Sequence, residues 1–270
     1  MRIAVLQMTS GIDPAANAMT MVEAVAGAAA GGAVMLFTPE MSGLLDRDRS
    51  RAKASVQREA DDFVLAAVCA AAARHKIWVH IGSLAVEAGR VDGKLANRAF
   101  VIDALGEVVA RYDKMHLFDV DLPTGESWRE SGAYAGGDAV VVVDTPVGAL
   151  GLSICYDLRF PALYAALSQA GATVLAIPAA FTVPTGQAHW HILMRARAIE
   201  NACFVVAAAQ AGHHGDGRDT YGHSLVIGPW GDVLLDMGQT PGLGFCDLDP
   251  AHVADVRARI PVLAHRRVVS

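Results

Sequence analysis

Cysteine is scarce in this chain, and long apolar runs and basic stripes are absent from it. The 270 residues include four cysteines, Cys69, Cys155, Cys203 and Cys246, and no two have the close spacing of a zinc or redox motif. Such usage is typical of a reducing compartment, so we expect a cytoplasmic protein. Three of them, Cys69, Cys203 and Cys246, lie in or beside apolar stretches, where free cysteine acts as a small core side chain.

The longest apolar stretch, residues 63–73, is bracketed by charged residues. It is shorter than the roughly 20 residues that a membrane-spanning helix needs, so we expect a buried, alanine-rich helix and no association with a membrane. The chain opens directly on a strand-like segment, residues 2–7, and we therefore expect no signal peptide.

Basic residues are outnumbered by acidic ones, 22 against 28, for a net charge of −6. Without a basic stripe to neutralise a phosphate backbone, a nucleic-acid partner is not expected. Hydrophobic residues make up 53% of the chain, which is enough to bury a large core. No linker rich in proline, serine or charge divides the sequence, so we predict a single domain over residues 1–270.

Strand-like and helical segments alternate at both ends of the chain, and hairpins fill the middle. This pattern predicts an α/β protein whose sheets carry helices on their outer faces, in one core or in two facing ones. The predicted strands are 3–7, 34–38, 77–82, 97–103, 107–112, 140–145, 150–154, 173–177, 204–209 and 244–248, and the predicted helices are 15–30, 61–75, 161–169, 187–200 and one from residue 250.

Three reactive side chains follow strand-like segments. Glu40 follows residues 35–39, Lys114 follows residues 108–113, and Cys155 follows residues 149–154 and precedes the predicted helix at 161–169. Strand ends are where α/β folds gather functional groups. A thiol becomes a nucleophile when a cation, a base or a helix N-terminus lowers its pKa, and Cys155 could have all three. Each residue alone also fits a plain structural role, as a core thiol or as a surface charge.

The order of these three residues resembles that of the nitrilase superfamily of carbon–nitrogen hydrolases. The resemblance is carried by FTPE (37–40), YDKMHLF (112–118) and GLSICYDLRFP (151–161), and it extends over residues 2–267. It implies a four-layer α-β-β-α sandwich, in which two sheets pack face to face. It also implies a Glu-Lys-Cys triad formed by Glu40, Lys114 and Cys155, and no metal or organic cofactor.

The resemblance implies acyl transfer through a thioester. In this scheme Glu40 takes the proton of Cys155, the thiolate attacks an amide carbon, and Lys114 and the Tyr156 backbone N–H hold the oxyanion. A second acidic residue would position the amide; Glu130 fits the family's pattern better than Glu126. Phe181 and Thr185, in the loop before the helix at 187–200, are further substrate contacts that the resemblance implies.

Within the superfamily, the C-terminal half resembles the branch that hydrolyses deaminated glutathione. The matching segments are CYDLRFP (155–161), AHW (188–190), RARAIE (195–200), VVAAAQ (205–210) and YGHS (221–224). The expected substrate is therefore a small amide, cleaved to 2-oxoglutarate and cysteinylglycine. Arg159, His213 and His214 near the pocket mouth would hold its carboxylates. The neighbouring ω-amidase branch, which acts on 2-oxoglutaramate, shares the triad and stays an alternative.

Two other readings stay open on the sequence. Cys155 could pair with a histidine, or His189 and His191 could bind a metal, but residues two apart on a helix do not share a face. A catalytically silent scaffold is the alternative from another class, and the presence of the whole triad argues against it. The family packs helices across a twofold axis, so we expect a homodimer or a larger assembly.

Overall fold

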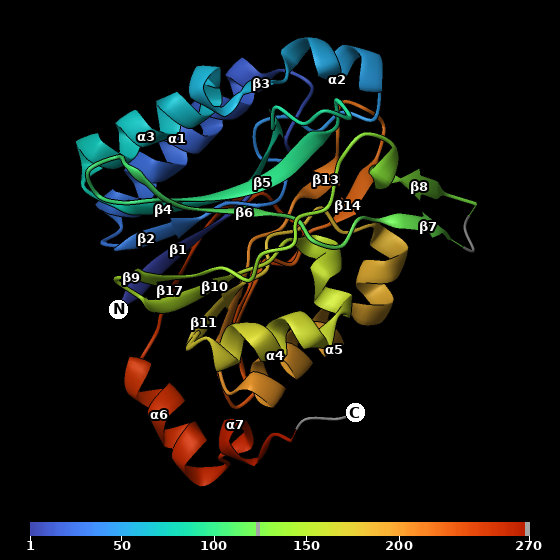
Figure 1. Ribbon diagram of the computed structural model, residues 1–270. Coiled ribbons are helices and arrows are strands. Elements are labelled where there is room, and N and C mark those ends of the chain that lie inside the picture. The colour runs from blue at the N-terminus through green and yellow to red at the C-terminus, as the bar shows by residue number, and fades with distance from the viewer. Residues whose placement is uncertain (123–124, 268–270) are drawn as a thin grey trace.

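Two β-sheets pack face to face between two layers of helices in the computed structural model, which describes residues 1–122 and 125–267 (Figure 1). The helices α1 (Pro14–Ala30) and α3 (Phe63–His75) cover the first sheet, and α4 (Pro161–Gln169) and α5 (Val183–Asn201) cover the second. The predicted four-layer α-β-β-α sandwich is confirmed.

The first sheet runs in the order β17-β1-β2-β4-β5-β6, and β3 pairs with β4 outside this path. Within it β1, β2 and β4 are parallel, whereas β17, β5 and β6 are joined by antiparallel pairings. Its strands are β1 (Arg2–Gln7), β2 (Met35–Phe37), β3 (Gln57–Arg58), β4 (Trp78–Glu87), β5 (Leu95–Ile102), β6 (Val108–Asp113) and β17 (Gly242–Asp247).

The alternation of side chains along β1 shows why this sheet is covered on both faces. Ile3 and Val5 belong to the core between the sheets, whereas Ala4 and Leu6 belong to the core beneath α1 and α3. Successive strand residues point to opposite faces, so a strand that is apolar throughout must be buried on both.

The second sheet runs in the order β16-β15-β12-β11-β10-β9. Its strands are β9 (Val142–Thr145), β10 (Gly148–Leu152), β11 (Val174–Ala176), β12 (Phe204–Ala207), β15 (Leu225–Ile227) and β16 (Val233–Asp236). Helix α5 begins at Val183, four residues before the predicted start, because Pro184 is well suited to the first turn of a helix.

Several short elements were not predicted, and Figure 1 shows two hairpins among them, β7-β8 and β13-β14, toward the same end of the sandwich. They are too short, or too polar, to show a clear period in the sequence. The additional elements are α2 (Arg49–Ser55), β7 (Asp119–Asp121), β8 (Ser127–Arg129), β13 (Ala211–His213), β14 (Asp219–Tyr221) and α7 (Val262–His265), with three 3₁₀ turns, η1 (Glu59–Asp61), η2 (Glu130–Gly132) and η3 (Cys155–Arg159). The predicted helix from residue 250 is α6 (Pro250–Arg259).

Helix α3 is buried on one face, so the prediction of a buried helix holds for that face only: Phe63 at its start is 45% exposed. The predicted core cysteines also differ among themselves, since Cys203 is buried but Cys69 and Cys246 are half-buried. All are free thiols. Among the described residues, none of the helices combines the length and the apolar character needed to cross a membrane.

Candidate active site

The structure brings Glu40, Lys114 and Cys155 together from three loops. Glu40 lies three residues beyond the end of β2, Lys114 directly follows β6, and Cys155 opens the 3₁₀ turn η3 beyond β10. All three are buried, with Lys114 only 2% exposed. A charged side chain at this depth is unfavourable unless it is paired.

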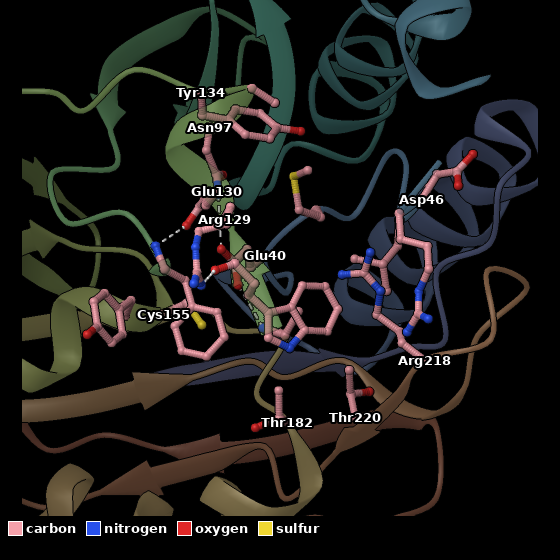
Figure 2. Close-up of a pocket in the computed structure, with 18 of the residues that line it drawn as sticks. Glu40, Asp46, Asn97, Arg129, Glu130, Tyr134, Cys155, Thr182, Arg218 and Thr220 are labelled. Atoms are coloured by element: carbon pink, nitrogen blue, oxygen red, sulfur yellow. Dashed lines mark hydrogen bonds between the residues drawn. The ribbon is translucent and has the colours of Figure 1, made fainter. Parts of the chain in front are cut away.

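Lys114 lies between two carboxylates. Its Nζ is 2.9 Å from Glu40 Oε1 and 2.8 Å from Glu130 Oε2. The Asn97 amide donates to both acids, over 3.0 Å to Glu40 and 3.1 Å to Glu130, and the Phe118 backbone N–H donates to Glu130 over 2.7 Å. Figure 2 shows Asn97, Glu130 and Glu40 converging on this point. The predicted positioning residue, Glu130, therefore contacts the lysine directly.

These contacts keep the carboxylate and the ammonium of the triad ionised. Burial alone would raise the pKa of Glu40, but the charge of Lys114 and hydrogen bonds from Cys155, Lys114 and the Ala180 N–H bring it below the usual value. Burial alone would lower the pKa of Lys114, but Glu130 and Glu40 raise it well above its ordinary value. Glu40 is thus a carboxylate at neutral pH, ready to accept a proton.

The thiol of Cys155 behaves differently from the prediction. Burial and the negative charge of Glu40 raise its pKa well above the ordinary value, and they outweigh the opposing effect of Lys114. The expectation of a pKa lowered by a nearby cation is therefore wrong. In the resting site Cys155 is a neutral thiol that donates a hydrogen bond to Glu40. The base must remove this proton as the sulfur attacks.

Cys155 lies on a strained turn. Its φ is +48°, in the left-handed region that a residue other than glycine rarely adopts, and its N–H donates to the Pro178 carbonyl over 2.8 Å. Tyr156 is the second residue of η3, and the first N–H groups of a helix lack intrahelical acceptors. The Tyr156 N–H is therefore available beside the sulfur, where an oxyanion would form.

Asp157 ties the cysteine loop to the lysine loop. This fully buried carboxylate accepts hydrogen bonds from the Tyr112 hydroxyl at 2.7 Å, from the Ile154 N–H at 2.9 Å, and from the backbone N–H of His116 at 2.9 Å. The ring Nδ1 of His116 lies 2.7 Å from the same carboxylate. This role of Asp157 was not predicted, because its partners on the lysine loop, Tyr112 and His116, lie 45 and 41 positions upstream.

Gln210 supports the glutamate loop in a similar way. Its amide nitrogen donates to the Glu40 carbonyl over 3.0 Å and to the Ser10 hydroxyl over 2.6 Å, while its oxygen accepts from the Ser10 N–H over 2.9 Å. Gln210 is fully buried. The position of the base therefore depends on Gln210 and, through it, on Ser10, two residues from distant parts of the chain.

A cavity of about 420 Å³ opens in front of Cys155, and all the predicted substrate contacts line it: Glu130, Tyr156, Phe181 and Thr185. Phe181 packs on Trp190, with ring centres 5.0 Å apart. Thr185 lies within the first turn of α5 rather than in the predicted loop, and its hydroxyl is 2.7 Å from that of Thr182.

The three residues predicted near the mouth lie elsewhere. His214 is buried and bonded through its ring to the Ser10 carbonyl, and burial lowers its pKa. Arg159 is not among the residues that line the cavity, and its guanidinium lies over the rings of Tyr156 and Phe181. His213 lines a neighbouring cavity of about 520 Å³ and contacts Asp219 at 2.9 Å. None of the three therefore lines the 420 Å³ cavity, and the expected exposure of His214 was wrong because a loop sequence does not show which of its side chains are enclosed.

Four arginines and Lys53 are the cations outside the triad that line the cavity. Arg47, Arg49, Arg129 and Arg218 line it together with Trp128 and Glu126. Figure 2 shows Arg218 on the opposite side of Glu40 from Cys155. The cavity thus has a reactive end and a basic end.

The two histidines considered as metal ligands do not come together. His189 Nδ1 lies 3.4 Å from an Arg159 nitrogen, whereas His191 Nε2 lies 3.0 Å from a carboxylate oxygen of Asp236. Asp236 also contacts His223 Nδ1 at 2.9 Å. His191, His223 and Asp236 form the one group in the described part of the chain that could hold a metal ion, and none of the three lines the 420 Å³ cavity.

Comparison with known proteins agrees with this geometry. The chain is 38% identical to the deaminated glutathione amidase of Yersinia enterocolitica over 272 residues, which covers 99% of this chain and 93% of that protein. The structure of the C. elegans NitFhit protein, a nitrilase and fragile histidine triad fusion, superposes with a TM-score of 0.90 at 38% identity, covering 98% of this chain and 65% of that one.

A mutant amidase from Nesterenkonia sp. AN1 superposes with a TM-score of 0.79 at 29% identity, covering 97% of this chain and 98% of that one. Its structure shows the result of Michael addition of acrylamide at the active site cysteine. The carbon-nitrogen hydrolase family matches residues 2–258 of the present chain. The predicted resemblance is confirmed, and the chain belongs to the carbon-nitrogen hydrolase family.

Proposed function

We propose that this protein is an amidase that cleaves deaminated glutathione through a thioester on Cys155. The observation that carries the proposal is the contact of a neutral, buried thiol with an ionised Glu40 that is held by Lys114. This is the arrangement that a nucleophile with its own general base requires. A silent scaffold would have no need to keep two carboxylates and an ammonium buried at a cavity wall.

In the first half of the reaction, Glu40 takes the proton of Cys155 while the sulfur attacks the amide carbon. The carbonyl electrons move to oxygen, and Lys114 and the Tyr156 N–H stabilise the resulting oxyanion. When this intermediate collapses, the carbon–nitrogen bond breaks and Glu40 returns the proton to the leaving amine. The products of this half are a free amine and a thioester on Cys155.

In the second half, Glu40 takes a proton from water, and the hydroxide attacks the thioester carbon. The carbon–sulfur bond breaks, the carboxylic acid leaves, and the sulfur recovers its proton from Glu40. Glu130 does not exchange protons in this scheme. It holds Lys114 and, at the cavity wall, accepts a hydrogen bond from the substrate amide.

The choice of substrate rests on the relatives and on the shape of the cavity. The Yersinia relative is named a deaminated glutathione amidase, and it is similar to this chain along almost its whole length. A volume of about 420 Å³ falls in the range of small-molecule sites and accommodates an amide with groups on both sides. The basic end suits a substrate with carboxylates. Cleavage gives 2-oxoglutarate and cysteinylglycine.

The experiment is a comparison of kcat/KM for deaminated glutathione and for 2-oxoglutaramate, measured by release of 2-oxoglutarate. We expect the peptide-like amide to be preferred. A clear preference for 2-oxoglutaramate would move the protein to the ω-amidase alternative, and the absence of release from either amide would favour the scaffold.

We also propose that the protein acts in the cytoplasm as a homodimer. Its four cysteines are free, which suits a reducing compartment. Ile192 and Ile199 on α5 are 70% and 48% exposed. Trp230 is 50% exposed, and Gly231 of the same turn lies against Ile199. Such apolar side chains favour a partner across α5. Light scattering that shows only a 28.3 kDa species would contradict the dimer.

A further inference from the structure

The basic end of the cavity contains hydrogen-bond donors that no acceptor of the protein uses. Arg218, in the loop between β13 and β14, donates from Nε to Asp216 Oδ2 over 2.7 Å. Within residues 1–122 and 125–267, its two terminal nitrogens have no hydrogen-bond partner. Its side chain is nevertheless only 16% exposed. An arginine fork held by one nitrogen, with the other two directed elsewhere, is ready to bind an anion.

Arg47 supplies a second cation without a counter-ion. Its backbone N–H donates to Asp216 Oδ2 over 2.8 Å, but its guanidinium forms no ion pair in the described part of the chain. The nearby acid Asp46 is already engaged, because its buried carboxylate accepts from Arg51 at 2.6 Å and 2.8 Å. The positive charge of Arg47 is thus not neutralised locally.

Trp128 links the two arginines and adds a third donor. The guanidinium carbon of Arg218 lies 4.8 Å from the centre of the indole, and that of Arg47 lies 5.7 Å from it. The indole Nε1 is buried and has no acceptor among the residues that the structure describes. A buried N–H without an acceptor is costly, and native proteins retain few of them. This donor can therefore accommodate an acceptor atom of a bound molecule.

We propose that Arg47, Arg218 and Trp128 form a subsite for a carboxylate of the substrate. The proposal rests on the function proposed above and specifies how that cavity recognises an acidic amide. A carboxylate presents two oxygens with about four acceptor positions, enough for two arginines and an indole N–H. Glu126 also lines this end, so selectivity for an anion must come from the arginines. Deaminated glutathione carries one carboxylate on its 2-oxo acid part and another on its glycine.

Binding tests the subsite apart from catalysis. In a Cys155→Ala background, calorimetry would compare deaminated glutathione with two analogues, one with the glycine carboxylate replaced by a primary amide and one with the 2-oxo acid carboxylate so replaced. We expect one analogue to bind about 10- to 100-fold more weakly, as for the loss of a hydrogen bond between charged groups. That analogue identifies which carboxylate the subsite holds. When Arg47→Gln is combined with Cys155→Ala, the ratio of the Kd of that analogue to the Kd of deaminated glutathione should fall several-fold toward one.

Matched controls separate a built subsite from general attraction. Arg74→Gln removes an exposed cation from the last turn of α3, outside the residues that line the cavity, and should leave the ratio unchanged. Arg218→Gln should act like Arg47→Gln; because it leaves the buried Asp216 unpaired, the double change with Asp216→Asn serves if the single variant does not fold.

Equal affinity for the acid and both analogues, or a loss in Arg74→Gln as large as in Arg47→Gln, would overturn the subsite. Failure of the proposed function would look different. In that case unmodified protein would not release cysteinylglycine, even if the ratio depended on Arg47.

Discussion

The two ends of the cavity treat charge in opposite ways. At the reactive end Lys114 bonds to two carboxylates, and Asn97 bonds to the same pair, so every one of these charges has a partner before a substrate arrives. At the basic end Arg47 has no counter-ion and Arg218 uses one of its three nitrogens, within the described residues. At the reactive end, paired charges hold the catalytic groups in place before the substrate binds. At the basic end, recognition depends on cations whose partner is an anionic group of the substrate.

Removal of the nucleophile at the reactive end should give the largest loss of activity. Cys155→Ala should lower kcat by about 10⁴-fold or more, because nothing else in the mechanism can form the thioester. Glu40→Gln should have an effect of the same order, since the amide cannot take the proton of a thiol with a raised pKa. Steady-state rates and circular dichroism would be measured together. Cys246→Ala is the control and should retain near-native turnover; substantial activity in Cys155→Ala would exclude it as the nucleophile.

Asp157→Ala tests whether the reactive end depends on the link between its two loops. The change leaves the Tyr112 hydroxyl, the Ile154 N–H and the His116 donors without their acceptor. We expect the free energy of unfolding to fall by at least about 3 kcal/mol, measured by urea denaturation, with turnover reduced as well. Asp144→Ala, at an exposed position, should change stability by less than about 0.5 kcal/mol. Similar stabilities of the two variants would show that the link is unimportant.

Substitution of the two acids after Lys114, Glu130 and Glu126, should affect different kinetic constants at the two ends of the cavity. Glu130→Gln should lower kcat about 100-fold, because it weakens the contact that holds Lys114 in place and the contact that orients the substrate amide. Glu126→Gln should act mainly on KM, since Glu126 lines the wall shared with the basic end. Kinetics on one acidic amide would compare them. A larger fall in kcat for Glu126→Gln would reassign the positioning role.

His80 gives the smallest expected effect and concerns the strand beneath the reactive end. Burial lowers its pKa to about 3, from an ordinary value near 6.5. Below pH 6.5 the unfolded chain binds a proton that the folded chain excludes, so this group destabilises the fold as pH falls from 6.5 toward 3. Between pH 7.5 and 5.5, the wild type should lose about 1.4 kcal/mol more than His80→Gln. Urea denaturation at both pH values measures this difference. The control is His189→Gln, at an exposed position, which should lose as much stability as the wild type. Equal losses in the wild type and in His80→Gln would contradict the lowered pKa of His80.

The sheets, the major helices and the three triad residues could be predicted because each leaves a local trace. Strand and helix periods are visible over a few residues, and Glu40, Lys114 and Cys155 each follow such a segment. Helix α2 left no trace, because it buries none of its residues and so lacks an apolar period. Most of the short elements that carry the basic end were missed for similar reasons.

The charges of the site could not be predicted, because they depend on depth and on contacts between distant residues. Asn97 bonds to a glutamate 57 positions away, and Gln210 to the backbone of the same residue 170 positions away. The raised pKa of Cys155 follows from burial, which a motif does not report. The sequence does not reveal that the Arg218 side chain is only 16% exposed, or that its neighbour His214, expected at the mouth, is enclosed.

The central claim, that Cys155 carries the acyl group of an acidic amide, is tested most directly by trapping the intermediate. Protein incubated with deaminated glutathione would be quenched with acid during turnover and digested, and the peptides would be weighed by mass spectrometry. The account predicts a 2-oxoglutaryl adduct on the peptide that contains Cys155, and no such adduct in Cys155→Ala. Release of 2-oxoglutarate without any adduct, or with an adduct on another residue, would contradict it.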